Sequence, residues 1–461
     1  MLILYVIAFL LLISFIQKNK KFSSKDPPGP LELPIIGSIY KINPKMPHLE
    51  MTRLSKVYGK VFKMWFGKNY TIIINDASIY REMYVDKAAM FGDRPNLPSL
   101  HLLVPGLRDI SLENYDAWKP VREFTSTSLA RSRSRTLNGI LDYQTNQILN
   151  SLKQFSKIRE PFSPSFYYQK YTINVILKMA FNDEIPYSES PSEGLMAKIV
   201  TPIDQIMNRL AGNSIFDHIY GLGHLYYYIT KFRGTEADKI RVELKKYYND
   251  HLSTLDKENP RDILDHLIIG GFDEERVINV SLDLLVAGGE TSATTMEWFT
   301  IVMVNNPECQ EKAADELRKV VGKDNGLVTV SHRQSTPYTN ALLRELFRYK
   351  TVGPLGPLPR VAREDAVIQD YFIPKGTIIL SNIYAIHNDE KHYQSPRQFI
   401  PERFLTDQHY EHWLPFSIGA RNCLGLSIAV DEIYVLCSNL LLNFKISSAN
   451  GQKLDETESM K

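Results

Sequence analysis

The sequence has few cysteines and no marked excess of charge. Its 461 residues include only 3 cysteines, and 54 lysines and arginines balance 52 aspartates and glutamates. An odd number of widely spaced cysteines argues against a disulfide scaffold and favours a reducing compartment. A net charge of +2 provides no broad basic surface, so no nucleic acid partner is expected. Hydrophobic residues make up 44% of the chain, which is enough to bury a large core and excludes a disordered protein.

Several common catalytic signatures are also missing. The sequence contains no P-loop, no G-x-G-x-x-G after a strand, no H-E-x-x-H and no G-x-S-x-G. Strand-like runs are few, and they comprise Tyr70–Asn75, Ala366–Phe372 and Gly376–Asn382. Helical patterns dominate elsewhere, so we expect a mainly α fold with a minor β part. No composition break follows Pro30, which favours one large body over residues 31–461.

The N-terminal segment is much more apolar than the rest of the chain. Residues 1–17, MLILYVIAFLLLISFIQ, carry no charged side chain. A helix of this length spans about 25 Å, slightly less than a hydrocarbon core of roughly 30 Å. A cleaved signal peptide is the alternative, but neither a basic segment before the run nor a small-residue cleavage site after it is present. We therefore predict a transmembrane signal anchor, and the lysines that follow predict a body in the cytosol.

Residues 18–30 join this anchor to the body. The segment contains Lys18, Lys20, Lys21 and Lys25, and it ends in Pro27-Pro28-Gly29-Pro30. Proline fixes φ and removes an N–H donor, so the proline-rich part can form neither a helix nor an inner strand. We interpret residues 18–30 as a basic, proline-rich hinge.

The most informative stretch is Phe416-Ser-Ile-Gly-Ala-Arg-Asn-Cys423-Leu-Gly425, which precedes an apolar helical run over Leu426–Leu442. A cysteine just before a helix lies where free N–H groups and the helix dipole favour a thiolate. A thiolate is a soft metal ligand and can be an axial ligand of haem iron. Gly419 and Gly425 would allow close approach of the backbone, Phe416 could shield the sulfur, and Arg421 could reach an anionic cofactor edge. A buried structural cysteine is the alternative, but the full spacing is rare by chance.

This stretch resembles the haem-binding loop of the cytochrome P450 superfamily, of the eukaryotic microsomal type. The resemblance extends from Pro27 to Asn439. It implies a cytochrome P450 fold in which residues 31–461 form a single haem domain. It also implies haem b, iron protoporphyrin IX, with Cys423 as the axial ligand of the iron.

Two further motifs match that family. In the helix predicted over Pro337–Tyr349, Glu345 and Arg348 lie three residues apart on one face. An ordinary surface ion pair is the alternative, but the pair resembles the family's Glu-x-x-Arg. Pro401-Glu402-Arg403-Phe404 resembles the segment whose arginine joins it. We assign Glu345, Arg348 and Arg403 a structural role.

A long helix is predicted over Asp273–Asn305, and its middle reads Ala287-Gly-Gly-Glu290-Thr291. Two central glycines cost roughly 1 kcal/mol each relative to alanine. One explanation is that they provide room for a bound diatomic molecule; a close helix crossing or a kink is the other. The pattern resembles the family's oxygen-activation motif, which implies catalytic roles for Glu290 and Thr291 in proton delivery.

Cations are expected near the haem propionates. Trp118-Lys-Pro-Val-Arg122 resembles the family's Trp-x-x-x-Arg helix, and Arg94 and Arg360 occupy positions that contact propionates in many relatives. Together with Arg421 and Phe416, these residues complete the predicted cofactor-binding set.

The chain ends soon after the last predicted helix. Leu442–Ser447 and a turn at Asn450-Gly451 are expected to begin a β-hairpin whose second part is missing. A non-catalytic or inactive truncated paralogue therefore stays open, as does a haem-thiolate isomerase that uses a peroxide substrate. The favoured hypothesis is a haem-thiolate monooxygenase that acts on an apolar small molecule.

The resemblance also implies partners and a location. NADPH-cytochrome P450 reductase is the expected electron donor, with cytochrome b5 as a possible second donor and membrane lipid as the surrounding medium. The expected location is the endoplasmic reticulum membrane, with one spanning helix and a cytosolic catalytic domain.

Overall fold

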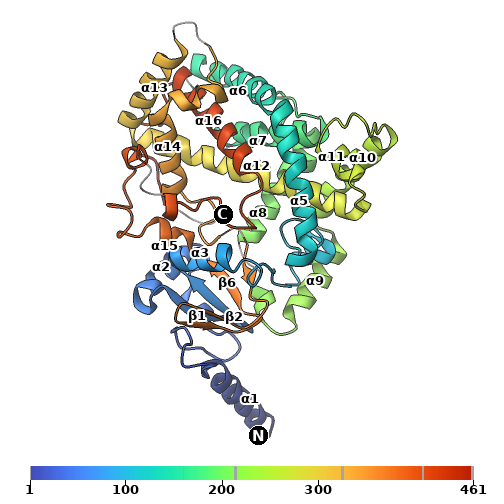
Figure 1. The fold of residues 1–461 in the computed structure, drawn as a ribbon, viewed down its shortest axis with the longest axis vertical. Coiled ribbons are helices and arrows are strands. Elements are labelled where there is room, and N and C mark those ends of the chain that lie inside the picture. The colour runs from blue at the N-terminus through green and yellow to red at the C-terminus, as the bar shows by residue number, and fades with distance from the viewer. Residues whose placement is uncertain are drawn as a thin grey trace.

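The computed structural model describes residues 2–158, 160–211, 215–322, 326–356, 358–406 and 410–457. Helices dominate this part of the chain (Figure 1), which confirms the mainly α prediction. The helices are α1 Leu2–Asn19, α2 Pro47–Tyr58, α3 Ala77–Arg81, α4 Leu100–Leu103, α5 Tyr115–Ser132, α6 Asn138–Ile158, α7 Ser165–Phe181, α8 Thr201–Ala211, α9 Leu222–Arg233, α10 Glu236–Ser253, α11 Ile263–Ile269, α12 Glu274–Asn305, α13 Pro307–Val321, α14 Pro337–Tyr349, α15 Ile383–His387 and α16 Leu426–Asn443. The strands are β1 Val61–Phe66, β2 Asn69–Ile74, β3 Arg360–Val361, β4 Ala366–Ile368, β5 Tyr371–Ile373 and β6 Ile378–Ser381.

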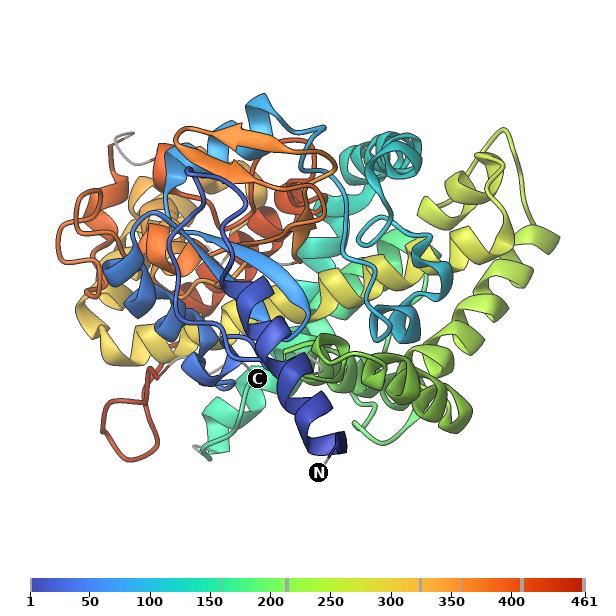
Figure 2. The same cartoon turned by 90° about the horizontal axis from the view of Figure 1, so that it is seen from below.

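Helix α12 runs through the middle of the molecule (Figures 1 and 2). Its 32 residues match the predicted helix to within one residue. The helix begins where the Asp273 carboxylate accepts a hydrogen bond from the Arg276 N–H, and it ends before Pro307. Buried side chains of α12 join those of α7, α10 and α16 in one large apolar core. This core holds the middle of α12 against α7 and α16.

A small sheet lies at the end of the molecule that carries α1 (Figure 1). Its strand order is β1-β2-β6-β3, with β1 and β2 antiparallel and β2 and β6 parallel. The predictions for β2 and β6 are confirmed, whereas β1 and the two-residue β3 were not predicted. The prediction of one strand over Ala366–Phe372 is wrong. The chain reverses at Gln369, whose φ is 49°, and forms the β4–β5 hairpin.

Helix α1 projects from the body (Figure 1), but its last turn contacts the body. The Lys18 ammonium is buried and donates to the Gly67 carbonyl at 2.6 Å, in the turn between β1 and β2. Asn19 exchanges hydrogen bonds with the backbone of Glu32. The anchor and hinge boundaries at residues 17 and 30 stay predictions, although the helix continues past residue 17.

Among the described residues, α16 is the one helix that is long and apolar enough to cross a membrane, and 67% of it is buried. Burial of this kind identifies α16 as a core helix. The apolar part of α1 over Ala8–Asn19 is shorter. The transmembrane anchor therefore stays a prediction.

The predicted hairpin strand over Leu442–Ser447 is wrong. Helix α16 continues to Asn443, and residues 444–457 form no strand. Ile446 and Gln310 exchange two hydrogen bonds, and Leu454 and Asn305 exchange two more. Side chains of α12 and α13 therefore satisfy backbone groups of the tail that a neighbouring strand would otherwise bind.

Candidate haem site

Cys423 lies in a turn immediately before α16. Its backbone N–H donates to the Phe416 carbonyl at 2.9 Å, which closes the loop that precedes the helix. Gly419 has a φ of 76°, and a Cβ there would collide with the Tyr84 carbonyl, so this position requires glycine. A Cβ at Gly425 would meet no atom within 4 Å. The close approach predicted at both glycines therefore occurs at Gly419 only, and the side of the loop at Gly425 is open.

The thiol of Cys423 differs in exposure from the thiols of the other two cysteines. Cys309 and Cys437 are buried, whereas Cys423 is reached by solvent. Burial of its surroundings still raises the pKa of the Cys423 thiol, although the Gly425 N–H and the charge of Arg122 act in the opposite direction. The expected stabilisation of a thiolate by the helix N-terminus is thus outweighed by desolvation. A metal ion that displaces the proton would supply the missing charge.

Phe416, the first residue of this loop, packs against two other aromatic side chains, and its predicted shielding of the sulfur stays a prediction. Its ring lies 5.1 Å from Phe347 in α14 and 6.0 Å from Trp413, both in edge-on contact. The aromatic group joins the loop to α14. It therefore holds the turn that presents Cys423.

Arg94, Arg360 and Arg421 gather near one another from three separate parts of the chain. Burial, followed by the charges of Arg94 and Arg360, lowers the pKa of Arg421 to about 8. Burial and the charge of Arg360 likewise lower the pKa of Arg94 to about 9. Within the described chain, none of the three forms an ion pair with a carboxylate. Clustered cations without counter-charges require an anion.

The hydrogen bonds of these arginines show which donors are free. Arg94 donates to the carbonyls of Ser111, Leu358 and Pro359. Arg421 donates through Nη2 to the Glu113 carbonyl and lies 4.2 Å from the centre of the buried Trp118 ring. The Nε and Nη1 atoms of Arg421 are buried and have no partner. Orphaned guanidinium donors of this kind are costly unless a ligand accepts from them.

Arg122 lies one turn after Trp118 in α5. Its Nη2 donates to both the backbone and the side-chain oxygen of Asn422, at 2.8 and 2.9 Å. Arg122 therefore fixes the residue next to Cys423 and places a positive charge beside the thiol. The structure thus places Trp118 against Arg421 and Arg122 against Asn422, and the predicted role of both residues at the haem propionates stays a prediction.

These residues fit haem b. Cys423 offers a soft ligand on the open side of its loop, and Arg421 has two buried donors without a partner. A haem carries two carboxylates, which are the anions that this arginine cluster requires. Cys423 would hold the iron, and Arg94, Arg360 and Arg421 would face the propionates.

The glycines in the middle of α12 serve a helix crossing. A Cβ at Gly288 would lie 2.6 Å from Ile176, and one at Gly289 would lie 3.0 Å from Ile173, both in α7. The Thr172 hydroxyl of α7 donates to the Gly289 carbonyl at 2.5 Å. Room for a diatomic molecule is therefore not the reason for these glycines, and the alternative of a close helix crossing is confirmed.

Ala287 and Thr291 lie one turn apart on another part of α12. Ala287 is exposed and Thr291 is half-buried, and the Thr291 hydroxyl donates to the Ala287 carbonyl at 2.8 Å. The buried Glu290 accepts from Gln169 of α7 at 3.3 Å and from Thr294 at 3.4 Å. The acid and the hydroxyl thus come from adjacent residues but have different neighbours.

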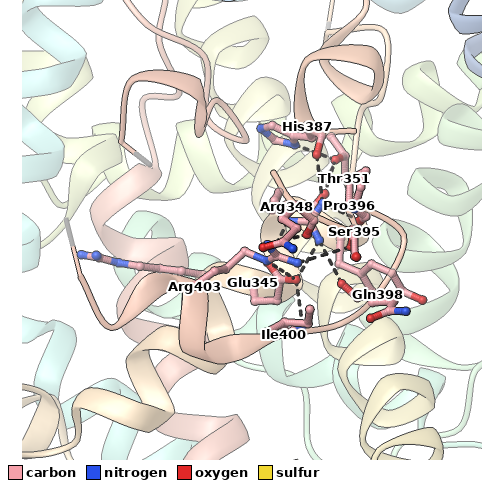
Figure 3. A network of polar contacts seen from close by, with 12 residues as sticks. Glu345, Arg348, Thr351, His387, Ser395, Pro396, Gln398, Ile400 and Arg403 are labelled. Carbon is pink, nitrogen blue, oxygen red and sulfur yellow. Dashed lines mark hydrogen bonds and ion pairs between the residues drawn. The ribbon is translucent and has the colours of Figure 1, made fainter. Parts of the chain in front are cut away.

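A buried ion network joins Glu345 and Arg348 of α14 to Arg403 (Figure 3). Glu345 and Arg348 have fully buried side chains and form two hydrogen bonds of 2.7 Å. Arg403 donates to the same carboxylate at 3.1 Å. Arg348 also donates to the carbonyls of His387 and Pro396. The surface ion pair that the sequence left open as an alternative is therefore excluded.

Sequence reasoning missed one acid in this region. Glu432 of α16 is buried and lies within hydrogen-bonding reach of Ser292, next to Thr291 in α12. Burial raises the pKa of Glu432 to about 8. Its place nine residues after Cys423 gives no signal by itself, because a glutamate in a helix is ordinary.

Comparisons with known proteins agree with this site. The family model described as Cytochrome P450 matches residues 27–461. The chain is 35% identical to "Probable cytochrome P450 519B1" of Dictyostelium discoideum, over 99% of this chain and 96% of the relative. It is 34% identical to "Probable cytochrome P450 508D1" of the same organism, over 99% of this chain and 95% of the relative.

A solved structure is also similar. It is a zebra fish cytochrome P450 determined with progesterone, and it superimposes with a TM-score of 0.76. The two chains are 28% identical, and the match covers 87% of this chain and 92% of the other. Proteins of this family bind haem through a cysteine thiolate, take electrons from redox partners and act on small molecules. The chain belongs to the cytochrome P450 family and is a haem-thiolate monooxygenase.

Proposed function

We propose that this monooxygenase is anchored in the endoplasmic reticulum membrane and hydroxylates apolar small molecules. Its electrons come singly from an NADPH-dependent flavoprotein reductase in the same membrane, and cytochrome b5 is a second donor. The observation that carries the chemistry is the pair of Ala287 and Thr291, which lie one turn apart in the middle of α12 and are joined by a hydrogen bond from the Thr291 hydroxyl to the Ala287 carbonyl at 2.8 Å.

Three residues have distinct roles in this reaction. When bound, the haem supplies the redox chemistry that activates O₂, and thiolate ligation by Cys423 favours O–O cleavage. The Thr291 hydroxyl holds a hydrogen bond to Ala287 that it can exchange for one to a ligand or a water. Glu290, one residue earlier, is the acid that supplies protons to this hydroxyl. A residue pair for proton delivery favours the monooxygenase over an isomerase that consumes a peroxide.

The membrane proposal rests on exposed apolar side chains at one end of the molecule. In α1, Tyr5, Phe9, Leu10, Leu12 and Ile16 are all exposed. Lys18 of α1 and His218, shortly before α9, both contact the turn between β1 and β2. Helix α9 presents further exposed apolar residues, and Phe232 is 93% exposed. An end with this composition suits a lipid surface, from which an apolar substrate would also arrive.

Reconstitution with the reductase tests the chemistry. We expect NADPH consumption coupled to hydroxylated product in the wild type, and a lower ratio of product to NADPH with more peroxide in Thr291→Ala. Thr295→Ala is the matched control, because its hydroxyl makes the same local bond to a carbonyl four residues earlier, at 2.9 Å. An unchanged ratio in Thr291→Ala removes its proposed role. Rearrangement of an organic hydroperoxide into an isomer that keeps both oxygen atoms, without NADPH or reductase, would instead support the isomerase.

Deletion of residues 1–16 tests the anchor while keeping Lys18 and Asn19, which contact the body. Each buried Leu, Ile, Phe or Val contributes roughly 0.3 to 0.6 kcal/mol to insertion. The full chain should resist carbonate extraction from microsomes, and the deleted form should be extracted with the same haem content. Carbonate resistance of the deleted form contradicts the anchor. A glycosylation tag after Lys25 that becomes modified in the lumen contradicts the cytosolic orientation.

A further inference from the structure

Two carboxyl groups meet between α12 and residues 108–113, which precede α5. Asp283 of α12 accepts hydrogen bonds from the backbone N–H groups of Ile110 at 2.9 Å and Ser111 at 3.1 Å. Asp109 is fully buried and accepts from the Leu112 N–H at 2.7 Å. The side chains of Asp109 and Asp283 lie within hydrogen-bonding reach of one another.

This geometry requires a proton. The Oδ2 atom of Asp109 is buried and has no donor among the described groups. Two ionised carboxylates in contact would repel one another in a medium of low polarity, so one of them keeps its proton. Burial raises the pKa of Asp109, and burial together with the charge of Asp109 raises the pKa of Asp283 well above its usual range. A proton between the two groups supplies the missing donor.

Residues 108–113 are also joined to the arginine cluster. The Ser111 carbonyl accepts from Arg94, and the Glu113 carbonyl accepts from Arg421. The Glu113 carboxylate binds Arg276 of α12 through two hydrogen bonds of 2.7 and 2.8 Å. The backbone of 108–113 is thus bound to α12 and also to Arg94 and Arg421.

We propose that a single proton shared by Asp109 and Asp283 fixes residues 108–113 on α12 and thereby positions Arg94 and Arg421 for the haem propionates. Asp109 and Asp283 are positioning residues, since they act through the two arginines. When the segment opens, both carboxyl groups enter water and the shared proton leaves to solvent. Opening therefore becomes easier as the pH rises, and haem is lost faster.

The charged groups around the pair do not replace this proton. The Asp109 carboxyl group interacts electrostatically with Arg94, Arg241 and Arg421. These arginines come from three different parts of the chain. On the segment itself, Arg108 pairs with Asp273 and Glu275 at the surface, and Glu113 pairs with Arg276. The arginines favour one ionised carboxylate in the pair, and the second carboxyl group retains the proton.

The rate of haem transfer to excess apomyoglobin, measured from about pH 6 to pH 8.5, tests this proposal. Release of one proton on opening makes the wild-type rate rise by up to about tenfold per pH unit. In Asp283→Asn, the amide can accept from both N–H groups and donate to Asp109 without a proton exchange. The variant should therefore retain haem and lose that extra pH dependence. Other titrating groups affect both proteins alike, so the difference between their slopes isolates the pair.

Two further variants sharpen the result. Asp283→Ala removes the contact and should lose haem at least about tenfold faster than Asp283→Asn at pH 7, a difference of the size expected for a buried hydrogen-bonded contact. Asp273→Asn disturbs a surface contact to the same segment and should keep the wild-type slope. Equal slopes for the wild type and Asp283→Asn overturn the proposal, as does equal haem loss in Asp283→Ala and Asp283→Asn. If Asp283→Ala fails to fold, the comparison of the two slopes still decides.

Discussion

Replacing Glu345 with glutamine should destabilise the enzyme far more than loss of a surface ion pair. The carboxylate accepts from Arg348 twice, from Arg403 and from the Ile400 N–H. Glutamine keeps the shape but places an amide donor against a guanidinium donor and removes the counter-charge of the fully buried Arg348. Breaking a buried pair in this way costs about 3–5 kcal/mol.

Asp315 provides a matched control in α13. Asp315 and Arg318 lie three residues apart, as do Glu345 and Arg348, and their ion-pair distance is also 2.7 Å. Both side chains of the control pair are about half exposed, at 55% and 50%. Asp315→Asn should therefore cost less than about 1 kcal/mol.

The two variants are compared by thermal and urea unfolding of the haem-loaded proteins. The CO-bound absorption spectrum monitors the unfolding. A chain of this size with a cofactor need not unfold in two states, so the decisive quantity is the order of the midpoints. Glu345→Gln should unfold well before Asp315→Asn and the wild type. Equal midpoints for the two variants would refute the claim that burial gives this ion pair its importance.

Two other predictions concern packing and pH. Gly288→Ala should destabilise the fold by about 1–3 kcal/mol despite better helix propensity, because the new Cβ meets Ile176. In urea unfolding, Gly288→Ala should cost less when it is introduced into Ile176→Ala than when it is introduced into the wild type. No coupling between these two substitutions would contradict the helix crossing. Burial lowers the pKa of His387 to about 3, so the unfolded chain binds a proton first as the pH falls below its usual 6.5. Stability is complete above about pH 6.5 and should drop by about 2 kcal/mol at pH 5, and His387→Gln should reduce that loss in urea titrations at the two pH values.

The elements that sequence predicted best are those with local signals. Helices α12 and α14 have a capping residue or a proline at their start and continuous apolar periodicity, so their bounds were predicted to within one residue. The hairpin of β4 and β5 was missed because a reversal at Gln369 needs no glycine or proline. The strand expected after α16 failed because the tail finds its hydrogen-bond partners on α12 and α13.

In the candidate site, too, the residues with local sequence signals were predicted and those defined by tertiary contacts were not. Cys423, Trp118, Arg122 and Arg421 belong to short motifs, and the structure brings them to one place. The glycines of α12 were ambiguous, because only the position of α7 shows what a Cβ would meet. Asp109 and Asp283 are far apart in sequence and in unrelated elements. No local pattern could have predicted that they share a proton.

The identity of the iron ligand is the central claim, and the reduced, CO-bound absorption spectrum tests it most directly. Cys423→Ser is compared with Cys309→Ser and Cys437→Ser, whose thiols are buried away from the loop. We predict that the wild type and both controls show the red-shifted Soret band of thiolate ligation and that Cys423→Ser does not. Retention of that band in Cys423→Ser would contradict the assignment of Cys423 and the account of the site built on it.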